Sequence, residues 1–342
     1  MELQGIRQVY EEQGLVLALG AGVASGSGIP TWTALLERVA EGVCGDEGPR
    51  LVSRLREAGF SLPAIAAILE RESDGEDEFR EVVRRALYQD LPWNGSSDRE
   101  LLEHTLDANT TLNAVAAFCA VPDAGGAFRR NPRVHAIVNF NLDALFSAFV
   151  EAKYKGKIGH GKGLARTVER ASKTSSLDRI SVYHPHGFLR FGPGEDGEDT
   201  SDRLIFTEHQ YFDFYDNPYS SFSSTILFLL REHPWLFVGL SMLDEDVRRL
   251  LHYSWKEQVQ AAREGPEDGD RKTEPRHFAL LASSGDEELD RHQRESLLAL
   301  GIDILWLRGY EEIPDGLRRI YQATGADWEA VFQAGRRRLS SR

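Results

Sequence analysis

The sequence predicts an α/β fold, in which a parallel sheet carries helices on both faces. Short apolar runs, typical of buried parallel strands, recur along the chain. Segments with helical periodicity lie between them, which is the alternation expected for a parallel sheet. The first apolar run also ends in a glycine-rich turn that leads directly into a helical segment. These three observations together indicate an open sheet with a ligand site at one edge.

The strands are expected at the apolar runs 15–19, 134–140, 180–184, 235–239, 277–282 and 302–307. Residues 33–120 show almost no strand pattern and contain several helical segments, so a small helical domain is expected as an insertion at about 33–125. The rest of 1–342 is expected to form one domain, with a charged loop at 263–275. Residues 326–342 at the end of the chain are expected to form a helix and a basic tail. The aromatic residues of that helix lie on one face, which can pack on the core or on a neighbouring subunit.

The composition narrows the class of protein. With 342 residues and 41% hydrophobic content, the chain can bury a large core. It has no apolar run of the length that crosses a membrane and no secretory signal at its N-terminus, so we expect a cytoplasmic protein without a membrane segment. A net charge of −14 disfavours stable nucleic-acid binding by this subunit alone, because such binding depends on contacts to phosphate.

The glycine-rich turn is the first candidate site. Gly20, Ala21 and Gly22 follow the first strand, and Ser25 to Gly28 and Pro30 precede the next helix. Such a turn presents backbone N–H groups to an anion, and glycines allow the backbone to approach a pyrophosphate closely. The expected ligand is therefore a nucleotide, although a tight structural turn is the alternative.

Two familiar nucleotide loops do not fit this turn. A Walker loop needs a lysine, and there is none between residues 1 and 152. The dehydrogenase fingerprint needs a third glycine, where this chain has Ser25, and then a second strand, where residues 33–43 are helical in pattern.

Polar residues also follow the second expected strand. Asn141 and Asp143 stand at its carboxyl end, where ligands of open α/β sheets bind. The structural alternatives are a turn-forming role for Asn141 and a helix N-cap role for Asp143. Asp143 can serve both purposes.

Two histidines follow the third expected strand. His184 and His186 are two residues apart and therefore on the same face of that strand. An imidazole titrates near neutral pH and suits a general base. The residues themselves leave the choice between His184 and His186 open.

The fourth candidate segment follows the strand at 235–239. Gly239, Leu240 and Ser241 form its turn, and Asp244 is expected to cap the helix that comes next.

These four segments resemble the motifs of the sirtuin family, in the family's order. The residues of the first segment that fit the family signature are Gly20, Ala21, Gly22, Ser27, Gly28, Ile29, Pro30 and Trp32, with Ser25 one position later than the usual serine. The resemblance continues in Asn141-Leu142-Asp143, in His186-Gly187, and in Gly239-Leu240-Ser241. Trp32 and the Arg-Arg-Leu-Leu run at 248–251 are similar to the short bacterial anti-phage defence branch.

The resemblance implies a Rossmann-like sheet with an inserted small helical domain. It also implies that NAD⁺ is bound as a substrate by the first segment together with Asp143, Gly239 and Ser241. In the family, the asparagine at the position of Asn141 holds the nicotinamide ribose and helps to place the reacting water. The histidine at the position of His186 is the catalytic base.

The chain departs from the deacylating sirtuins in one respect. Those enzymes hold zinc with two Cys-x-x-Cys pairs, whereas this chain has only Cys44 and Cys119. No zinc is therefore expected, and the residues after the histidine motif form an acidic polar loop, GPGEDGEDTSD, instead of an obvious peptide-binding strand.

The activity expected from the resemblance is hydrolysis of NAD⁺ to nicotinamide and ADP-ribose in anti-phage defence. It further implies a homo-oligomer that pairs with a HerA-type hexameric ATPase, since such an activity must be controlled. The alternatives are an NAD-dependent deacylase or ADP-ribosyltransferase, and a non-catalytic sensor of NAD or ADP-ribose.

Overall fold

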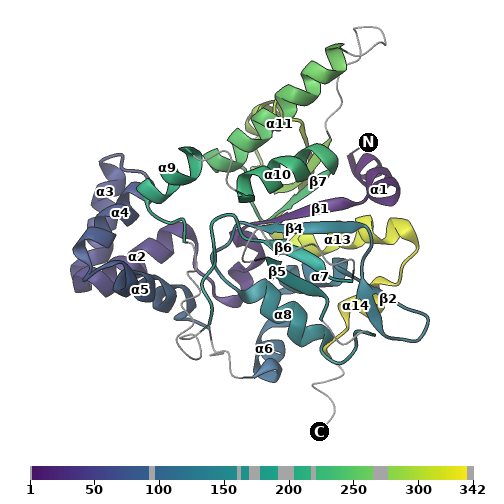
Figure 1. Cartoon of the computed structure of the whole chain (residues 1–342), viewed down its shortest axis with the longest axis horizontal. Coiled ribbons are helices and arrows are strands. Elements are labelled where there is room, and N and C mark those ends of the chain that lie inside the picture. Colours follow the sequence, from purple (N-terminus) through teal and green to yellow (C-terminus); the bar gives the residue numbers. More distant parts are fainter. Residues whose placement is uncertain are drawn as a thin grey trace.

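A computed structural model describes residues 2–91, 97–159, 163–168, 178–191, 204–216, 221–264 and 276–336. Its centre is a seven-stranded sheet in the order β5-β6-β4-β1-β7-β8-β9, and every neighbouring pair is parallel. Helices cover both faces (Figure 1). The predicted α/β class with a Rossmann-like parallel sheet is confirmed.

The strands of the sheet are β1 (Leu15–Leu19), β4 (Val134–Asn139), β5 (Ala165–Val168), β6 (Ile180–Tyr183), β7 (Trp235–Val238), β8 (His277–Ala282) and β9 (Ile302–Leu307). Six of them lie where the apolar runs predicted strands. The short strand β5 at the sheet edge was not predicted, because its sequence ARTV is partly polar and half-exposed. Neither was the small antiparallel pair β2 (Ala120–Pro122) and β3 (Phe128–Arg130).

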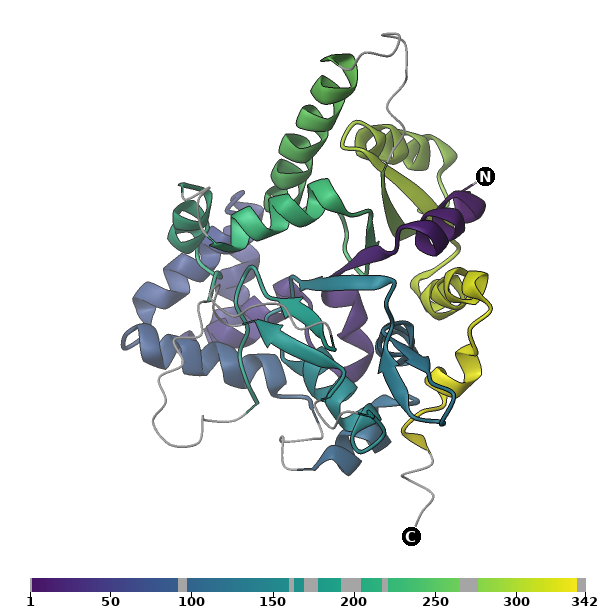
Figure 2. The same cartoon turned by 45° about the vertical axis from the view of Figure 1, so that its right-hand side comes forward.

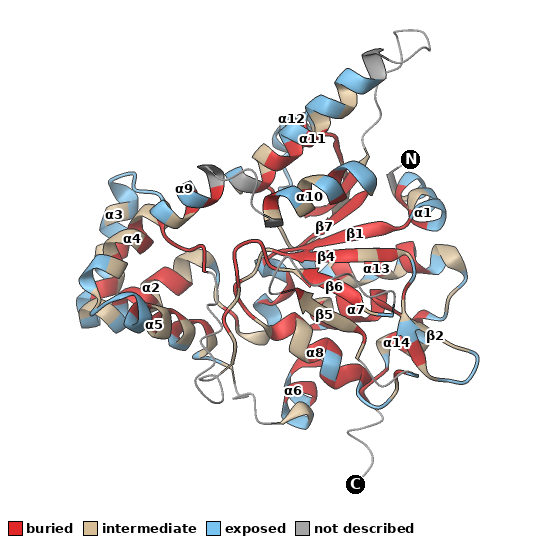
Figure 3. Cartoon of the chain, in the orientation of Figure 1, coloured by how far each residue is buried: buried red, intermediate tan, exposed pale blue. Residues whose placement is uncertain are grey.

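The apolar character of β1 follows from its central position. Leu15, Leu17 and Leu19 point into one buried cluster, and Val16 and Ala18 point into the other. A strand with helices on both faces has no solvent-exposed side, so its sequence is continuously apolar instead of alternating. Figure 3 shows the central strands buried along their length.

Each face of the sheet has its own set of helices. The first set is α1 (Glu2–Glu12), α7 (Thr110–Phe118), α8 (Leu145–Tyr154) and α13 (Ile313–Tyr321). The second set is α10 (Ser221–Glu232), α11 (Glu245–Glu264) and α12 (Glu287–Leu298). The outer part of α11 extends away from the body of the molecule in both views (Figures 1 and 2).

The helices between β1 and β4 pack in two places. One group lies beside the carboxyl ends of the strands and is called the helical unit below: α2 (Trp32–Cys44), α3 (Gly48–Glu57), α4 (Leu62–Glu72) and α5 (Glu76–Tyr88), contacted by α9 (Glu208–Asp216) (Figure 1). In contrast, α6 (Asp98–Thr105) and α7 pack on α8 of the sheet layer. Asn109 separates α6 from α7, because its side chain caps the second of these helices.

The end of the chain packs on the core. The final helix is α14 (Trp328–Phe332), and Trp328 is buried against Tyr321, with 5.3 Å between the ring centroids. Residues 337–342 of the basic tail, residues 265–275 of the charged loop and residues 192–203, with the acidic loop, lie outside the described residues. Within the described ranges, none of the helices has the length and apolar character needed to cross a membrane.

Candidate functional site

The candidate segments meet at one edge of the sheet. They follow the carboxyl ends of β1, β4, β6 and β7, which are four adjacent strands. The carboxyl ends of parallel strands share an edge, and here that edge faces the helical unit (Figure 1). The strand β4 pairs with one edge of β1, and β7 pairs with its other edge, so the strand order reverses direction at β1. Such a switch in strand order is where open α/β sheets bind ligands.

The glycines of two segments touch each other across this switch. Gly22 donates a backbone hydrogen bond of 3.0 Å to the carbonyl of Gly239, and a Cβ at Gly22 would lie 2.9 Å from the Gly239 Cα. A Cβ at Gly20 would lie 2.6 Å from the Gly239 carbonyl oxygen. The structure thus gives these glycines a packing role, because the β1 and β7 turns approach more closely than any side chain permits.

Hydrogen bonds within the glycine loop use several of its N–H groups. The loop forms two short 3₁₀ turns, Ala21–Val23 and Ser25–Ser27, and Gly28 ends the second with a φ of +91°. The N–H groups already engaged in backbone bonds are those of Gly20, Gly22, Val23, Ala24, Ser27 and Gly28. An anion bound here would therefore accept hydrogen bonds from the remaining N–H groups of the loop, unless it displaces these backbone bonds. The loop thus offers an anion fewer N–H donors than the sequence suggested.

Side chains also stabilise the loop. The Ser25 hydroxyl donates to the Gly22 carbonyl at 3.2 Å. Asn109, buried at the start of α7, donates its Nδ2 to the Val23 carbonyl at 2.9 Å and to the Ser27 hydroxyl at 3.0 Å. Sequence reasoning missed Asn109 as a support of the site, although its place before an apolar helix is a recognisable N-cap signal.

A small pocket joins the first two segments. Its volume is about 50 Å³, well below the several hundred cubic ångströms typical of ligand pockets. The predicted site residues that line it are Ala21, Ile29, Pro30, Trp32, Asn141 and Asp143. A whole dinucleotide is larger than this volume, so most of it would lie outside this pocket.

An aromatic contact closes one side of this region. Trp32 is stacked on Phe206, with 4.7 Å between ring centroids and 10° between planes. Phe206 is fully buried and also contacts Phe79 of α5. The neighbouring Ile205 donates its N–H to the His186 carbonyl at 2.8 Å. No sequence pattern indicates that Phe206 is the partner of Trp32.

Asn141 lies between the β1 and β4 turns. Its Nδ2 donates to the Gly20 carbonyl at 3.0 Å, and its backbone N–H donates to the Asn139 Oδ1 at 3.1 Å. The first bond uses the amide N–H of the side chain. Among the described residues no donor is bonded to the carboxamide Oδ1, so this oxygen can accept a hydrogen bond at the pocket wall.

The two histidines have different surroundings. His184 lies with its Nδ1 3.4 Å from the Asn141 carbonyl oxygen and its ring 4.7 Å from Phe188. Burial lowers the pKa of His184 to about 4, against a smaller raising effect of that hydrogen bond. His186 is buried among aromatic rings, with centroid distances of 5.6 Å to Phe140 and 5.5 Å to Tyr211. His186 therefore lies beside the residue that precedes Asn141.

Asp143 is not the N-cap of α8, because Ala144 holds that position, but its side chain bonds the backbone where the helix begins. Its Oδ1 accepts the Leu145 N–H at 3.0 Å, at the start of α8. The side chain is buried, and burial raises the pKa of its carboxyl from 3.8 to about 6, although backbone hydrogen bonds oppose the rise. Asp143 also lines the small pocket, which agrees with the predicted ligand-binding position.

The fourth segment forms a strained turn. Gly239 has a φ of +69°, and the buried Met242 has a φ of +60°. Residues other than glycine rarely adopt such a positive φ. Arg248 of α11 donates to the Met242 carbonyl at 3.2 Å and holds that conformation. Ser241 is exposed and accepts the Leu243 N–H at 3.4 Å.

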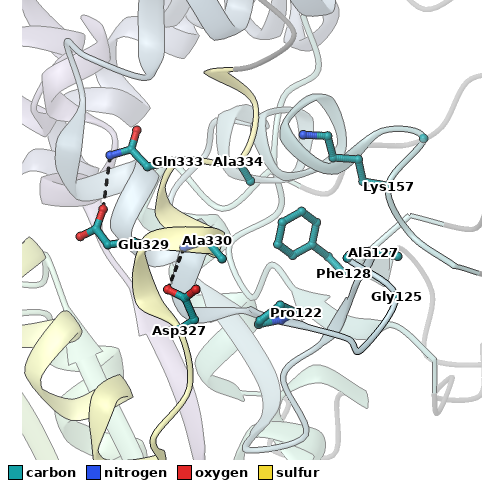
Figure 4. A pocket seen from close by; sticks show the side chains of 12 residues that line it. Pro122, Gly125, Ala127, Phe128, Lys157, Asp327, Glu329, Ala330, Gln333 and Ala334 are labelled. Carbon is teal, nitrogen blue, oxygen red and sulfur yellow. Dashed lines mark hydrogen bonds between the residues drawn. The ribbon is translucent and has the colours of Figure 1, made fainter.

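A hollow larger than this small pocket lies elsewhere (Figure 4). It measures about 900 Å³ and is formed by the β2–β3 turn, the residues after α8, and α14, at the amino edge of the sheet. The carboxylate of Asp327 caps α14 by accepting the Ala330 N–H, and that of Glu329 accepts from Gln333. Both acidic groups are thus already engaged, and none of the predicted site residues lines this hollow.

The cysteines are separate from the candidate site. Cys44 ends α2, and Cys119 is buried after α7, where burial raises the pKa of its thiol. Among the residues that the structure describes, no cluster of three or more His, Cys, Asp or Glu side chains could hold a metal ion.

Comparison with protein families gives a match. The SIR2-like domain family matches residues 135–305, half of the 342-residue chain. The chain therefore belongs to the SIR2-like family. The match includes Asn141, His186 and Gly239, whereas the glycine loop precedes it. Such domains are typically NAD-dependent enzymes, and membership implies NAD binding. No curated protein matches the chain.

Proposed function

We propose that this protein is an NAD⁺ glycohydrolase that releases nicotinamide and ADP-ribose. Family membership supports an NAD-dependent activity. The observation that carries the proposal is the placement of Asn141 and His186 at the ends of the neighbouring strands β4 and β6, next to the glycine loop. Asn141 offers a carboxamide oxygen there, and His186 offers an imidazole.

This reaction requires that the protein position NAD⁺ and a water molecule and supply one base. The bond between ribose C1′ and the nicotinamide nitrogen breaks, and its electron pair leaves with nicotinamide, which becomes neutral. A water oxygen forms the new bond to C1′ and loses one proton. In our proposal His186 accepts that proton, directly or through a ribose hydroxyl, and the Asn141 Oδ1 accepts a hydrogen bond from a ribose hydroxyl or the water.

The surroundings of His184 make it the less suitable base, which leaves His186 as the candidate. With a pKa of about 4, His184 is a weak proton acceptor near neutral pH. Its Nδ1 also faces the Asn141 carbonyl, so its better-supported role is to hold the backbone of Asn141.

We further propose that the activity is silent until a partner or assembly opens the site. The pocket of about 50 Å³ and the Trp32–Phe206 stack support this, since a dinucleotide needs more room. By the resemblance described above, the setting is bacterial anti-phage defence, with self-association and a HerA-type ATPase as the proposed controls.

Turnover of NAD⁺ tests the proposal. Nicotinamide release is measured for the wild type, Asn141→Ala and His186→Ala, each with and without the ATPase. His233→Ala is the matched control, because this half-buried histidine stacks on His135 at the amino ends of the strands. Both site variants should lose about 100-fold or more in turnover, and the control should retain it.

Other results identify the alternatives. Release that requires an added acyl-peptide indicates a deacylase, and transfer of ADP-ribose to protein indicates a transferase. Tight NAD⁺ or ADP-ribose binding without turnover under every activating condition indicates a sensor. Any of these outcomes contradicts hydrolysis as the primary activity.

A further inference from the structure

The end of helix α5 contacts the segments that carry the candidate site. Arg38 of α2 donates to the Ala86 carbonyl at 3.3 Å and forms an ion pair with Asp90. A Cβ at Gly28 would lie 3.3 Å from the Asp90 carbonyl oxygen. The glycine loop and the helix after it are therefore packed directly on residues 86–90.

Tyr88, the last residue of α5, links the two other segments. Its hydroxyl accepts the Ala144 N–H at 2.9 Å and donates to the Leu189 carbonyl. Ala144 comes three residues after Asn141, and Leu189 comes three residues after His186. One hydroxyl thus sets the separation between the backbones that carry the two proposed active-site residues.

A backbone contact closes the same junction. The Leu189 N–H donates to the Leu142 carbonyl at 2.6 Å, and Asp143 and Leu189 form an isolated parallel bridge. The Tyr88 ring packs on Phe191 with a centroid distance of 4.5 Å, which holds the hydroxyl in place. The Asn141 and His186 segments are therefore joined at two adjacent points, and one of them is supplied by the helical unit.

We propose that Tyr88 is a positioning residue that fixes His186 relative to Asn141 and couples their geometry to the helical unit. The role in catalysis rests on the proposed function. In this proposal Tyr88 acts through the Ala144 N–H and the Leu189 carbonyl, which its hydroxyl bonds. Any movement of α5 that opens the small pocket, which Leu87 also lines, moves this hydroxyl as well.

Tyr88→Phe tests the proposal, with Tyr321→Phe as the matched control. Tyr321 is a buried tyrosine whose hydroxyl donates to the Ala120 carbonyl at 2.8 Å, away from the candidate site. Both variants keep their ring and lose a hydroxyl that bonds the backbone. We measure kcat and KM for NAD⁺, and amide hydrogen exchange over residues 142–146 and 187–191 without ligand.

In Tyr88→Phe, kcat should fall by roughly 10- to 100-fold with KM changed much less, because reacting groups held slightly out of place slow the chemical step more than binding. Exchange of the Ala144 amide should be about tenfold faster. Tyr321→Phe should lower stability without either effect.

Unchanged kcat in Tyr88→Phe, or equal exchange over these residues in the two variants, would overturn the proposal. Failure of the proposed function has a different signature. In that case the wild type releases no nicotinamide under any condition, and the exchange difference alone decides whether Tyr88 fixes the two segments.

Discussion

The contact between the glycine loop and the β7 turn yields the sharpest prediction for stability. A Cβ at Gly239 would lie 2.7 Å from the Val23 nitrogen and 3.0 Å from the Gly22 carbonyl carbon. Both are backbone atoms, which cannot rotate away as a side chain does. Gly239→Ala should therefore push the two turns apart.

The magnitude has two parts. A φ of +69° costs an L-residue about 1–2 kcal/mol. Overpacking against the fixed backbone adds about 1–3 kcal/mol. The expected loss in the free energy of unfolding is therefore about 2–5 kcal/mol.

Gly325→Ala separates these two parts. Gly325 has a similar φ of +71°, and a Cβ there would meet nothing within 4 Å. Its substitution should cost only the backbone strain, about 1–2 kcal/mol. The free energy of unfolding of each variant is measured by urea denaturation, together with NAD⁺ affinity.

Gly239→Ala should lose more stability than Gly325→Ala and should also bind NAD⁺ more weakly, because the β1 and β7 turns no longer meet. Equal losses of stability in the two variants would refute the reasoning, since close backbone approach would then contribute nothing.

Two further substitutions test supports of the site. The pKa of the Asp143 carboxyl is about 6 in the folded protein and 3.8 in the unfolded chain. The folded protein therefore binds this proton more tightly, and the wild type loses stability as the pH rises from about 4 to 6. Asp143→Asn keeps an acceptor for Leu145, so urea denaturation should find it more stable by about 3 kcal/mol at pH 8 and by about half that at pH 5. A pH-independent difference would contradict this pKa. Asn109→Asp keeps the cap acceptor of α7 but removes both donors to the glycine loop, so it should lose about 2 kcal/mol or more in the same assay. Wild-type stability in Asn109→Asp would show that capping is the only role of this residue.

Much of the fold is readable from local patterns. A strand buried on both faces must be apolar throughout, so LVLAL and the similar runs identify six of the seven strands. The strand β5 was not predicted, because a strand at the sheet edge buries less of its surface and its sequence can therefore contain polar residues. The break at Asn109 could be found from capping chemistry, because the cap acts within the α7 sequence itself.

The candidate site was only partly readable. Asn141, Asp143, His184 and His186 could be placed at the edge of the sheet because each follows a strand, and parallel strands end together. The separate role of His184 emerged only from its burial beside the Asn141 carbonyl. The Trp32–Phe206 stack joins residues far apart in the chain, so no local pattern records it.

The sequence by itself determined that the sheet is parallel and which polar or glycine-rich segment follows each strand. These features depend on the hydrophobic period and on turn chemistry within short stretches of sequence. Only the tertiary structure decided which groups meet. Gly22 and Gly239 need their missing side chains because two distant turns touch, and Tyr88 matters because its hydroxyl reaches two other segments. Distances between remote residues are set by the packing of the whole fold, and no short stretch of sequence encodes them.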